Sequence, residues 1–222
     1  MSRESSDLTA STLLRAYAMG AFPMARHRYD ERLVWLDPEE RGIIPLETFH
    51  LSRSLKRTIR RGEFTVRCDT AFEAVMRHCA EATPKRPKTW INEDILRLFA
   101  ELHGAGLAHS VESWVGDTLV GGVYGLSLGS AFFGESMFSR AADASKVALA
   151  HLVARLKKGG YTLLDTQFTT PHLSRLGAIE IPRHDYHRRL THALATMAVF
   201  YGDLGDEEAL VLLSSQSSTQ IS

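Results

Sequence analysis

One carboxylate, Glu135, interrupts the apolar stretch "YGLSLGSAFFGESMFS" at residues 124–139. If residues 130–139 form a strand, alternate side chains share a face, which places Glu135 between Phe133 and Met137 on an apolar face. A carboxylate buried there without a partner is costly, so Glu135 needs a basic partner or a place in a cleft. The first alternative is a structural ion pair, and the second is a site for a cationic substrate.

A second polar pair lies in "LLDTQF" at residues 163–168. Asp165 and Gln167 are two residues apart, so on a strand both side chains reach the same side and the same substrate atom. The aspartate can accept or carry a proton, and the glutamine offers one donor group and one acceptor. The alternative is the polar end of a strand that bonds to neighbouring loops.

A third feature is a basic helix face between Phe49 and Gly62, a segment without any acidic residue. The arginines recur at i, i+4, i+7 and i+8, which is one face of a helix, and a lysine flanks them. These residues are Arg53, Lys56, Arg57, Arg60 and Arg61. A solvated surface helix is the common explanation of such a run, but that kind of helix usually mixes the two signs of charge. The pattern favours a phosphate-binding face suited to a short stretch of RNA backbone.

The composition excludes a uniformly basic nucleic-acid binder, because 26 Lys and Arg residues balance 26 Asp and Glu residues. Any basic surface must therefore be local. Cys68 and Cys79 have neither zinc-site nor redox-pair spacing and are expected to be reduced thiols. The N-terminus lacks a signal-peptide pattern, and no apolar run approaches the roughly 20 residues of a membrane span. We expect a cytoplasmic protein without a membrane segment, metal or cofactor.

The elements that must position these residues follow from hydrophobic periodicity. Residues 1–62 are predicted to form a small N-terminal domain, with a helix at 13–20, a turn at "AFPM", short extended pieces at 33–45 and a helix at 46–62. Residues 63–199 are predicted to form the larger domain. Its expected strands are 64–69, 108–116, 117–129, 130–139 and 161–169, and its expected helices lie within 70–82, 89–106, 143–160 and 185–199. Residues 200–222 are expected to be a disordered tail.

The order of these elements after residue 62 is strand, two helices, a run of antiparallel strands, helix, strand and helix. That order is typical of an α/β domain of the N-acetyltransferase type, in which helices flank a mixed central sheet. A fold of this kind does not identify the chemistry.

The chain resembles the leucyl/phenylalanyl-tRNA–protein transferase family, and the resemblance covers roughly residues 11–190. The stretches that carry it include "YAMGAFPM" (17–24), "WLDPEERGIIPLETFHLSRSLKR" (35–57), "HSVESW" (109–114), "LVGGVYG" (119–125), "GESMFSR" (134–140), "LLDTQ" (163–167) and "LGAIEIPRHDY" (176–186). The combination of "GESMFSR", "LVGGVYG" and the Asp-x-Gln strand is specific.

The resemblance implies a bacterial enzyme that moves Leu or Phe, and also Met, from aminoacyl-tRNA to the α-amino group of proteins beginning with Arg or Lys. The product is marked for degradation by the N-end rule. The domain would be acetyltransferase-like, with aminoacyl-tRNA in place of acetyl-CoA, and neither a metal nor another cofactor is implied.

The same resemblance assigns roles to residues. Asp165 and Gln167 match the catalytic strand, where we expect Asp165 to orient Gln167 and to accept proton density from the amine. Glu135 matches a carboxylate that holds the cationic end of the acceptor, together with Gln167. The residues that match the pocket for the aminoacyl-adenosine end are Trp35, Trp90, Ser136, Met137, Val123 and Phe99. The basic face at 50–61 matches the surface that holds the tRNA acceptor stem.

Two positions depart from the family pattern, since Val123 stands where Met is expected and Phe99 where Tyr is expected. Both reshape the pocket and leave the ranking of Leu, Phe and Met open. Two other functions stay open as alternatives: an acetyl-CoA-dependent N-acetyltransferase, and a tRNA-binding module with altered donor specificity. The junction "SRAADASK" (139–146) argues against the first, because it lacks the glycines of a pyrophosphate-binding loop.

Overall fold

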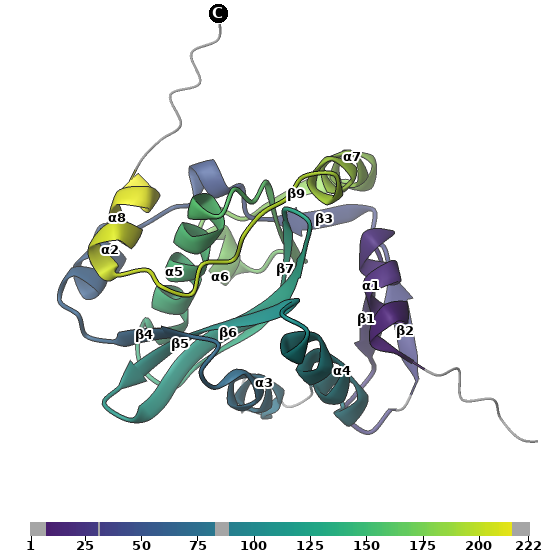
Figure 1. The fold of residues 1–222 in the computed structure, drawn as a ribbon, viewed down its shortest axis with the longest axis horizontal. Coiled ribbons are helices and arrows are strands. Elements are labelled where there is room, and N and C mark those ends of the chain that lie inside the picture. The colour runs from purple at the N-terminus through teal and green to yellow at the C-terminus, as the bar shows by residue number, and fades with distance from the viewer. Residues whose placement is uncertain (1–7, 31, 83–88, 215–222) are drawn as a thin grey trace, which may run out of the picture.

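The computed structural model describes residues 8–30, 32–82 and 89–214. Its centre is a seven-stranded sheet with the strand order β4-β5-β6-β7-β8-β3-β9 (Figure 1). The strands are β3 (Glu40–Ile43), β4 (Thr65–Cys68), β5 (Ala108–Val115), β6 (Thr118–Leu128), β7 (Ala131–Ser139), β8 (Leu163–Gln167) and β9 (Ile179–Pro182). Strands β7 and β8 are parallel, whereas the other neighbouring pairs are antiparallel. The predicted mixed sheet is confirmed.

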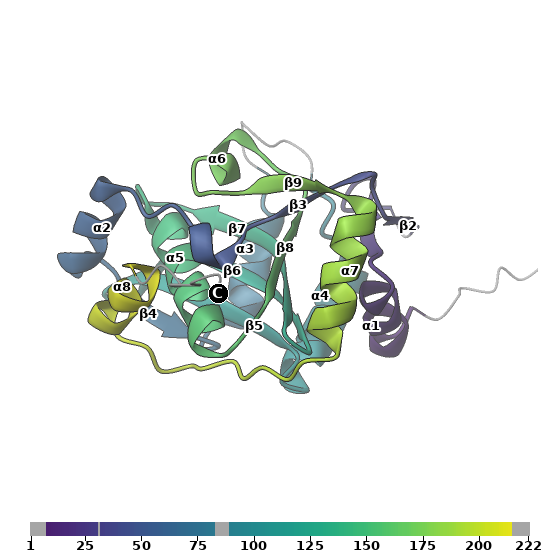
Figure 2. The same cartoon turned by 90° about the horizontal axis from the view of Figure 1, so that it is seen from above.

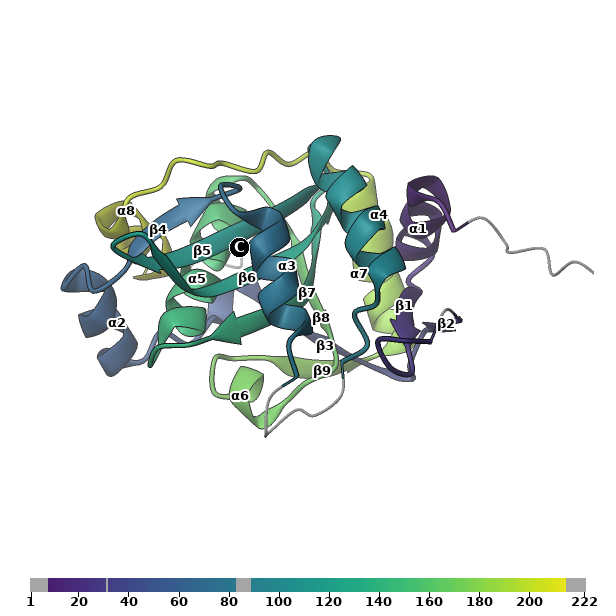
Figure 3. The same ribbon diagram turned by 90° about the horizontal axis from the view of Figure 1, so that it is seen from below.

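Helices cover both faces of this sheet, as predicted. Helices α3 (Phe72–Ala80) and α4 (Glu93–Gly104) lie on the face seen in Figure 3, and α5 (Ala144–Lys158) lies on the face seen in Figure 2. Each face has its own apolar core. The α4-side core includes Val75, Leu98, Phe99, Tyr124 and Phe133. The α5-side core includes Val111, Val123, Phe132, Leu149 and Leu164.

Local sequence signals explain the best-predicted elements. Asn92 caps α4, because its side chain accepts a hydrogen bond from the Ile95 N–H at 2.9 Å. Strands β5 and β6 form a hairpin that turns at Gly116, where the φ angle is +57°, a conformation that glycine adopts without strain. The predicted cap and hairpin are therefore confirmed.

The predicted helix at 46–62 is wrong in its first half. A short 3₁₀ helix, η1 (Leu46–Thr48), is followed by extended backbone, and α2 (Arg53–Arg60) begins only after the N-cap Ser52. The interruption has a tertiary cause, since the His50 N–H donates to the Leu176 carbonyl at 3.0 Å rather than to a helical partner.

The first elements of the chain form a small unit of their own. Helix α1 (Ala10–Ala18) is followed by β1 (Phe22–Ala25) and β2 (Leu33–Leu36), which pair as a separate two-stranded antiparallel sheet. The turn predicted at "AFPM" is therefore wrong, because residues 22–25 are a strand. Strand β3 pairs with β8 and β9 in the large sheet, although it precedes residue 62. This pairing weighs against a boundary at residue 62, which stays a prediction.

The helix predicted at 185–199 is confirmed as α7 (Arg183–Leu194), whereas local patterns did not reveal the other C-terminal helices. Helix α6 (Pro171–Ser174) precedes β9, and α8 (Asp206–Ser214) packs against α5. The tail predicted to be disordered from residue 200 is wrong for residues 206–214, because Ala209 and Leu210 are buried. Residues 215–222 lie outside the described residues. None of the helices in the described ranges has the length and apolar character needed to cross a membrane.

Candidate active site

A β-bulge places Glu135. In the pairing of β6 with β7, Tyr124 lies opposite Ser136 and Gly125 lies opposite Gly134, so Glu135 is the extra residue on β7. The bulge reverses the alternation of side chains along β7. Phe133 belongs to the α4-side core, whereas Met137 packs against the α5-side core. The prediction that Phe133, Glu135 and Met137 share one face is therefore wrong for Met137.

The Glu135 carboxylate is half-buried and has a partner from the N-terminal unit. The hydroxyl of Tyr17 on α1 donates to Glu135 Oε1 at 2.7 Å. The Tyr17 ring is buried and packs edge-on against Phe133, with 4.9 Å between the ring centroids. Burial raises the pKa of Glu135 to about 8, and the nearby Asp165 charge adds to the shift, while Tyr17 and Arg41 oppose it. The ion pair considered as one explanation of Glu135 is replaced by a tyrosine contact.

Asp165 on β8 is fully buried in a polar network. Its Oδ1 accepts from Arg41 Nε at 2.9 Å and from the Gln167 N–H at 2.8 Å. Its Oδ2 accepts from Arg41 Nη2 at 2.6 Å and from the Tyr186 hydroxyl at 2.9 Å. Arg41 is also fully buried, and its Nη1 donates to the Gly20 carbonyl at 2.8 Å. Because four donors surround the carboxylate, neither oxygen is open to an incoming amine.

Gln167 is held in an unusual backbone conformation. Its φ angle is +58°, in the left-handed region that non-glycine residues rarely adopt. Both neighbours of its buried side-chain amide are carbonyl oxygens, so the orientation that satisfies them points Nε2 toward Gly134 O at 2.9 Å and Thr166 O at 3.2 Å. That orientation leaves Oε1 as the acceptor group. Strain of this kind, fixed by a buried carboxylate, is characteristic of functional sites.

These contacts bring the three predicted polar residues together. Phe133 on β7 pairs with Asp165 on β8, and the Gln167 amide reaches the carbonyl of Gly134, which directly precedes Glu135. Asp165 and Glu135 also face the same side of the sheet, because their partners Tyr186 and Tyr17 both lie in the α4-side core.

The aromatic and apolar residues assigned to a pocket do not form one cluster. Val123 and Met137 are cross-strand partners whose side chains lie on the α5 side of the sheet. Phe99 is fully buried on the α4 side, where its ring meets Tyr124 edge-on at 5.6 Å. Trp90 is partly buried against the same α4-side core, Trp35 is 39% exposed on β2, and Ser136 is half-buried beside the bulge.

The basic helix is present, and most of its charges face solvent. Leu55 and Ile59 are buried, whereas Arg53, Arg57 and Arg60 are exposed and form no ion pair with any carboxylate in the described part of the chain. Arg61 lies 3.6 Å from Glu63, so its charge is partly balanced by an acidic residue just after the helix. Lys56 is half-buried and donates to Ser214 Oγ at 3.4 Å.

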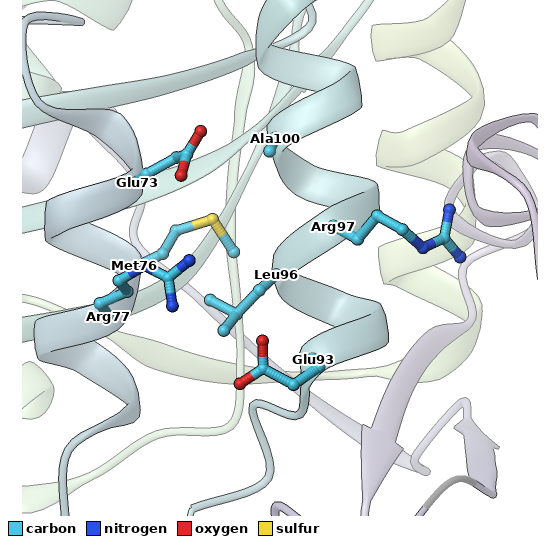
Figure 4. A pocket seen from close by; sticks show the side chains of 7 residues that line it. All are labelled: Glu73, Met76, Arg77, Glu93, Leu96, Arg97 and Ala100. Atoms are coloured by element: carbon cyan, nitrogen blue, oxygen red, sulfur yellow. The ribbon is translucent and has the colours of Figure 1, made fainter.

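Two hollows lie away from the Gln167 site. One, of about 140 Å³, lies between α3 and α4 and contains none of the predicted residues (Figure 4). Its lining residues are Glu73, Met76, Arg77, Glu93, Leu96, Arg97 and Ala100. The other, of about 610 Å³, is open and lies between residues 47–51, Lys56 and the end of α8.

Sequence reasoning missed Arg41, Tyr17 and Tyr186 as individual residues, although all three lie in stretches that carry the family resemblance. Arg41 offered one signal. It precedes Gly42 and two isoleucines in "ERGII", an apolar setting in which an arginine needs a buried partner. Gly42 allows β3 to approach β8, because a Cβ atom there would come within 2.6 Å of the Phe168 backbone.

Comparisons with known proteins identify the family. The family model described as leucyl/phenylalanyl-tRNA protein transferase matches residues 43–191. The family model of that protein's N-terminal domain matches residues 6–39. A relative from Paramagnetospirillum magneticum, named leucyl/phenylalanyl-tRNA–protein transferase, is 66% identical over 87% of this chain and 92% of its own length. Relatives of the same name from Caulobacter vibrioides and Rhodospirillum rubrum are 60% and 57% identical over 87% and 90% of this chain, and over 89% and 93% of their own lengths. The chain therefore belongs to the leucyl/phenylalanyl-tRNA protein transferase family.

Proposed function

We propose that this enzyme transfers Leu or Phe, and also Met, from aminoacyl-tRNA to the α-amino group of proteins that begin with Arg or Lys. The observation that carries the proposal is the Gln167 site, where a buried carboxylate holds a strained glutamine beside Glu135. Such an arrangement suits a reaction that needs positioning more than strong acid or base chemistry. Because the donor is charged tRNA, we place the activity in the cytoplasm, where it marks acceptors for N-end-rule degradation.

Gln167 positions the attacking amine. Its Nε2 is engaged by the Gly134 carbonyl, so Oε1 is the group that accepts a hydrogen bond from the amine. An α-amine has a pKa near 8, so roughly a tenth of it is neutral at pH 7 and no strong base is required. An amide is itself too weak a base to take the proton, and Gln167 therefore acts by orientation.

Asp165 acts through Gln167. Its carboxylate accepts the Gln167 N–H and stabilises the left-handed backbone, while Arg41 and Tyr186 hold the carboxylate in place. We therefore assign Asp165 to orientation alone. The expectation that it also accepts proton density from the amine does not fit a carboxylate that is fully buried and bonded to four donors.

Glu135 binds the cationic end of the acceptor. With a pKa of about 8 the group is mostly protonated in the free enzyme near neutral pH. A guanidinium or ammonium group nearby favours the charged form of a carboxyl, so the arrival of an Arg or Lys side chain would ionise it. Recognition of a cationic first residue is thereby linked to release of one proton.

The reaction balances without an added reactant. The neutral amine attacks the ester carbonyl, the new C–N bond forms, and the ester C–O bond to the terminal ribose breaks. The amine loses one proton, and the departing ribose oxygen takes one up. The amide product and a tRNA with a free hydroxyl result, so the activated ester supplies the driving force.

The donor is held at two places in this proposal. Trp35, Trp90, Ser136, Met137, Val123 and Phe99 remain the residues that we assign to the aminoacyl-adenosine end. Because they lie on both sides of the sheet, their roles differ, with Val123 and Met137 set apart from Phe99 and Trp90. The exposed arginines of α2, with Lys56 and Arg61, bind acceptor-stem phosphates.

The competing acetyl-CoA reading has little support at the start of α5. The Ala144 N–H donates to the Ala141 carbonyl at 3.2 Å, and the Ser145 N–H donates to Ser139 Oγ at 3.2 Å. These two N–H groups already have partners within the chain and are therefore not free to bind a pyrophosphate.

One assay tests the proposal. Labelled Leu, Phe, Met and Arg are offered on their tRNAs to peptides that begin with Arg, Lys, Asp or Glu. Transfer of Leu and Phe to the Arg and Lys peptides is expected. Transfer of Arg to the acidic peptides, or no transfer of Leu or Phe to any peptide, would contradict it.

A further inference from the structure

The segment after α7 runs along the molecule and ends in a helix next to the basic one. The three views agree that it leaves α7 near the α1 end and reaches α8 beside α2 at the opposite end (Figures 1, 2 and 3). The family model's match stops at residue 191, before this segment begins. Nothing in the proposed reaction uses it so far.

The segment is anchored along its length. The Val199 N–H donates to the Gly159 carbonyl at 3.1 Å, and the Phe200 ring stacks on His109 with 4.0 Å between centroids. Arg155 of α5 is 1% exposed, and its Nη2 donates to the Gly202 carbonyl at 3.0 Å. This hydrogen bond from a buried guanidinium fixes the segment to α5.

Helix α8 is fixed to α5 by both apolar and polar contacts. Ala209 is fully buried against Ala154 of α5 in a small apolar cluster. The buried His151 Nε2 lies 3.1 Å from Asp206 Oδ1, and Lys158 Nζ lies 2.7 Å from Glu208 Oε1. Acidic residues at the start of α8 also suit the positive end of its helix dipole.

Helix α2 packs against α8. Among the described elements, α2 packs mainly against α5 and α8. Its two buried side chains, Leu55 and Ile59, belong to the apolar cluster that also contains Leu210 of α8. Lys56 donates to Ser214 Oγ at the end of α8, and that end also lines the hollow beside Lys56.

We infer that α8 is a positioning element for tRNA binding, because it holds α2 so that Arg53, Arg57 and Arg60 present their charges together to a phosphate backbone. The inference rests on the proposed function only in that the phosphates belong to the donor tRNA. Helix α2 has eight residues, and a helix this short is marginal without tertiary packing. Loss of α8 would remove one of the two helices against which it packs.

The test uses the full chain with Leu210→Ala and Leu213→Ala together, because both residues pack with the cluster that contains α2. Val211→Ala is the matched control on the same helix, since Val211 is 68% exposed. A second variant ends the chain after Asp203 and keeps the Gly202 carbonyl on Arg155. Binding of Leu-tRNA is measured directly across a range of salt, and transfer is measured with Leu-tRNA and with leucyl-adenosine, which lacks the acceptor stem.

We expect both α8 variants to weaken Leu-tRNA binding by about tenfold and to reduce its salt slope by one unit or more, while the KM and kcat for leucyl-adenosine stay unchanged. The control should match the unaltered protein. Unchanged tRNA binding and salt slope in folded α8 variants would overturn the inference. An equal loss with leucyl-adenosine would overturn it too, because α8 would then serve stability alone. If the unaltered protein binds tRNA but transfers nothing, the proposed function fails, and the binding measurements still decide the role of α8.

Discussion

The buried pair of Arg41 and Asp165 allows stability and activity to be separated. Both side chains are fully buried and are joined by two hydrogen bonds of 2.9 and 2.6 Å. The change Arg41→Met removes the guanidinium and leaves the carboxylate with only the Tyr186 hydroxyl and the Gln167 N–H as donors. Removing one partner of a buried ion pair costs about 3–5 kcal/mol. A typical domain has a free energy of unfolding of about 5–15 kcal/mol, so the variant should be much less stable but still folded in the cold.

Adding Asp165→Leu to Arg41→Met gives the informative comparison. Apolar side chains of similar volume often replace a buried ion pair with little net loss. The Gln167 N–H and the Tyr186 hydroxyl then lose an acceptor, at about 1–3 kcal/mol for each unsatisfied group. If each of these two groups costs about 1 kcal/mol, the double variant loses about 2 kcal/mol where Arg41→Met loses about 4, so it should regain about 2 kcal/mol. Transfer should not return, because nothing holds the left-handed backbone of Gln167.

The measurements are urea unfolding followed by circular dichroism, and transfer of labelled Leu to a peptide beginning with Arg at a temperature where every variant is folded. Leu-tRNA binding serves as the control, since α2 lies on the opposite side of the molecule from β3, the strand that carries Arg41 (Figure 1). The reasoning is refuted if Arg41→Met costs less than about 1 kcal/mol. It is also refuted if the double variant recovers transfer together with stability.

Three further changes test other parts of the site. Glu135→Gln keeps an acceptor for Tyr17 but cannot titrate. Between pH 4.5 and about 8 the folded enzyme holds a proton on Glu135 that the unfolded chain releases, so the free energy of unfolding of the unaltered enzyme should fall as the pH rises through that window. In urea unfolding at several pH values, the variant should lack this dependence. The same variant should raise the KM for Arg and Lys peptides. Gln167→Gly relieves the left-handed strain, so its free energy of unfolding should stay within about 1 kcal/mol of that of the unaltered enzyme, while transfer falls about tenfold or more. Full activity would show that the amide does not position the amine. Arg57→Ala with Arg60→Ala should raise the KM for aminoacyl-tRNA and reduce its salt slope by about one to two units, and an effect on the peptide KM alone would contradict the assigned surface.

Helices and strands with strong local signals were predictable from the sequence. The Asn92 cap and the Gly116 turn depend on residues within a few positions of one another, so a short window contains their cause. The predictions that failed concern elements whose conformation depends on packing against residues far away in the sequence. Residues 49–52 leave the helical conformation because His50 bonds to Leu176, and α8 forms on a surface that α5 supplies.

The candidate site was predictable only in part. The residue types at Glu135, Asp165 and Gln167, with their period of two along strands, indicated polar groups on a sheet. The bulge at Glu135 was not predictable, because it arises where β7 has one residue more than β6 in their pairing. That single extra residue turned Met137 to the side of the sheet on which Val123 lies, away from Phe99 and Trp90.

The sequence by itself determined the family and the approximate order of elements, because the matching motifs and the hydrophobic periods are local patterns. The tertiary structure decided which groups pair with the two carboxylates of the site. Asp165 acquires its partner from Arg41, 124 residues away, and Glu135 acquires Tyr17, 118 residues away. No short-range pattern encodes such pairs, since burial of a charge is decided by everything that packs around it. That burial makes Asp165 a fixed support for Gln167 and keeps a proton on Glu135.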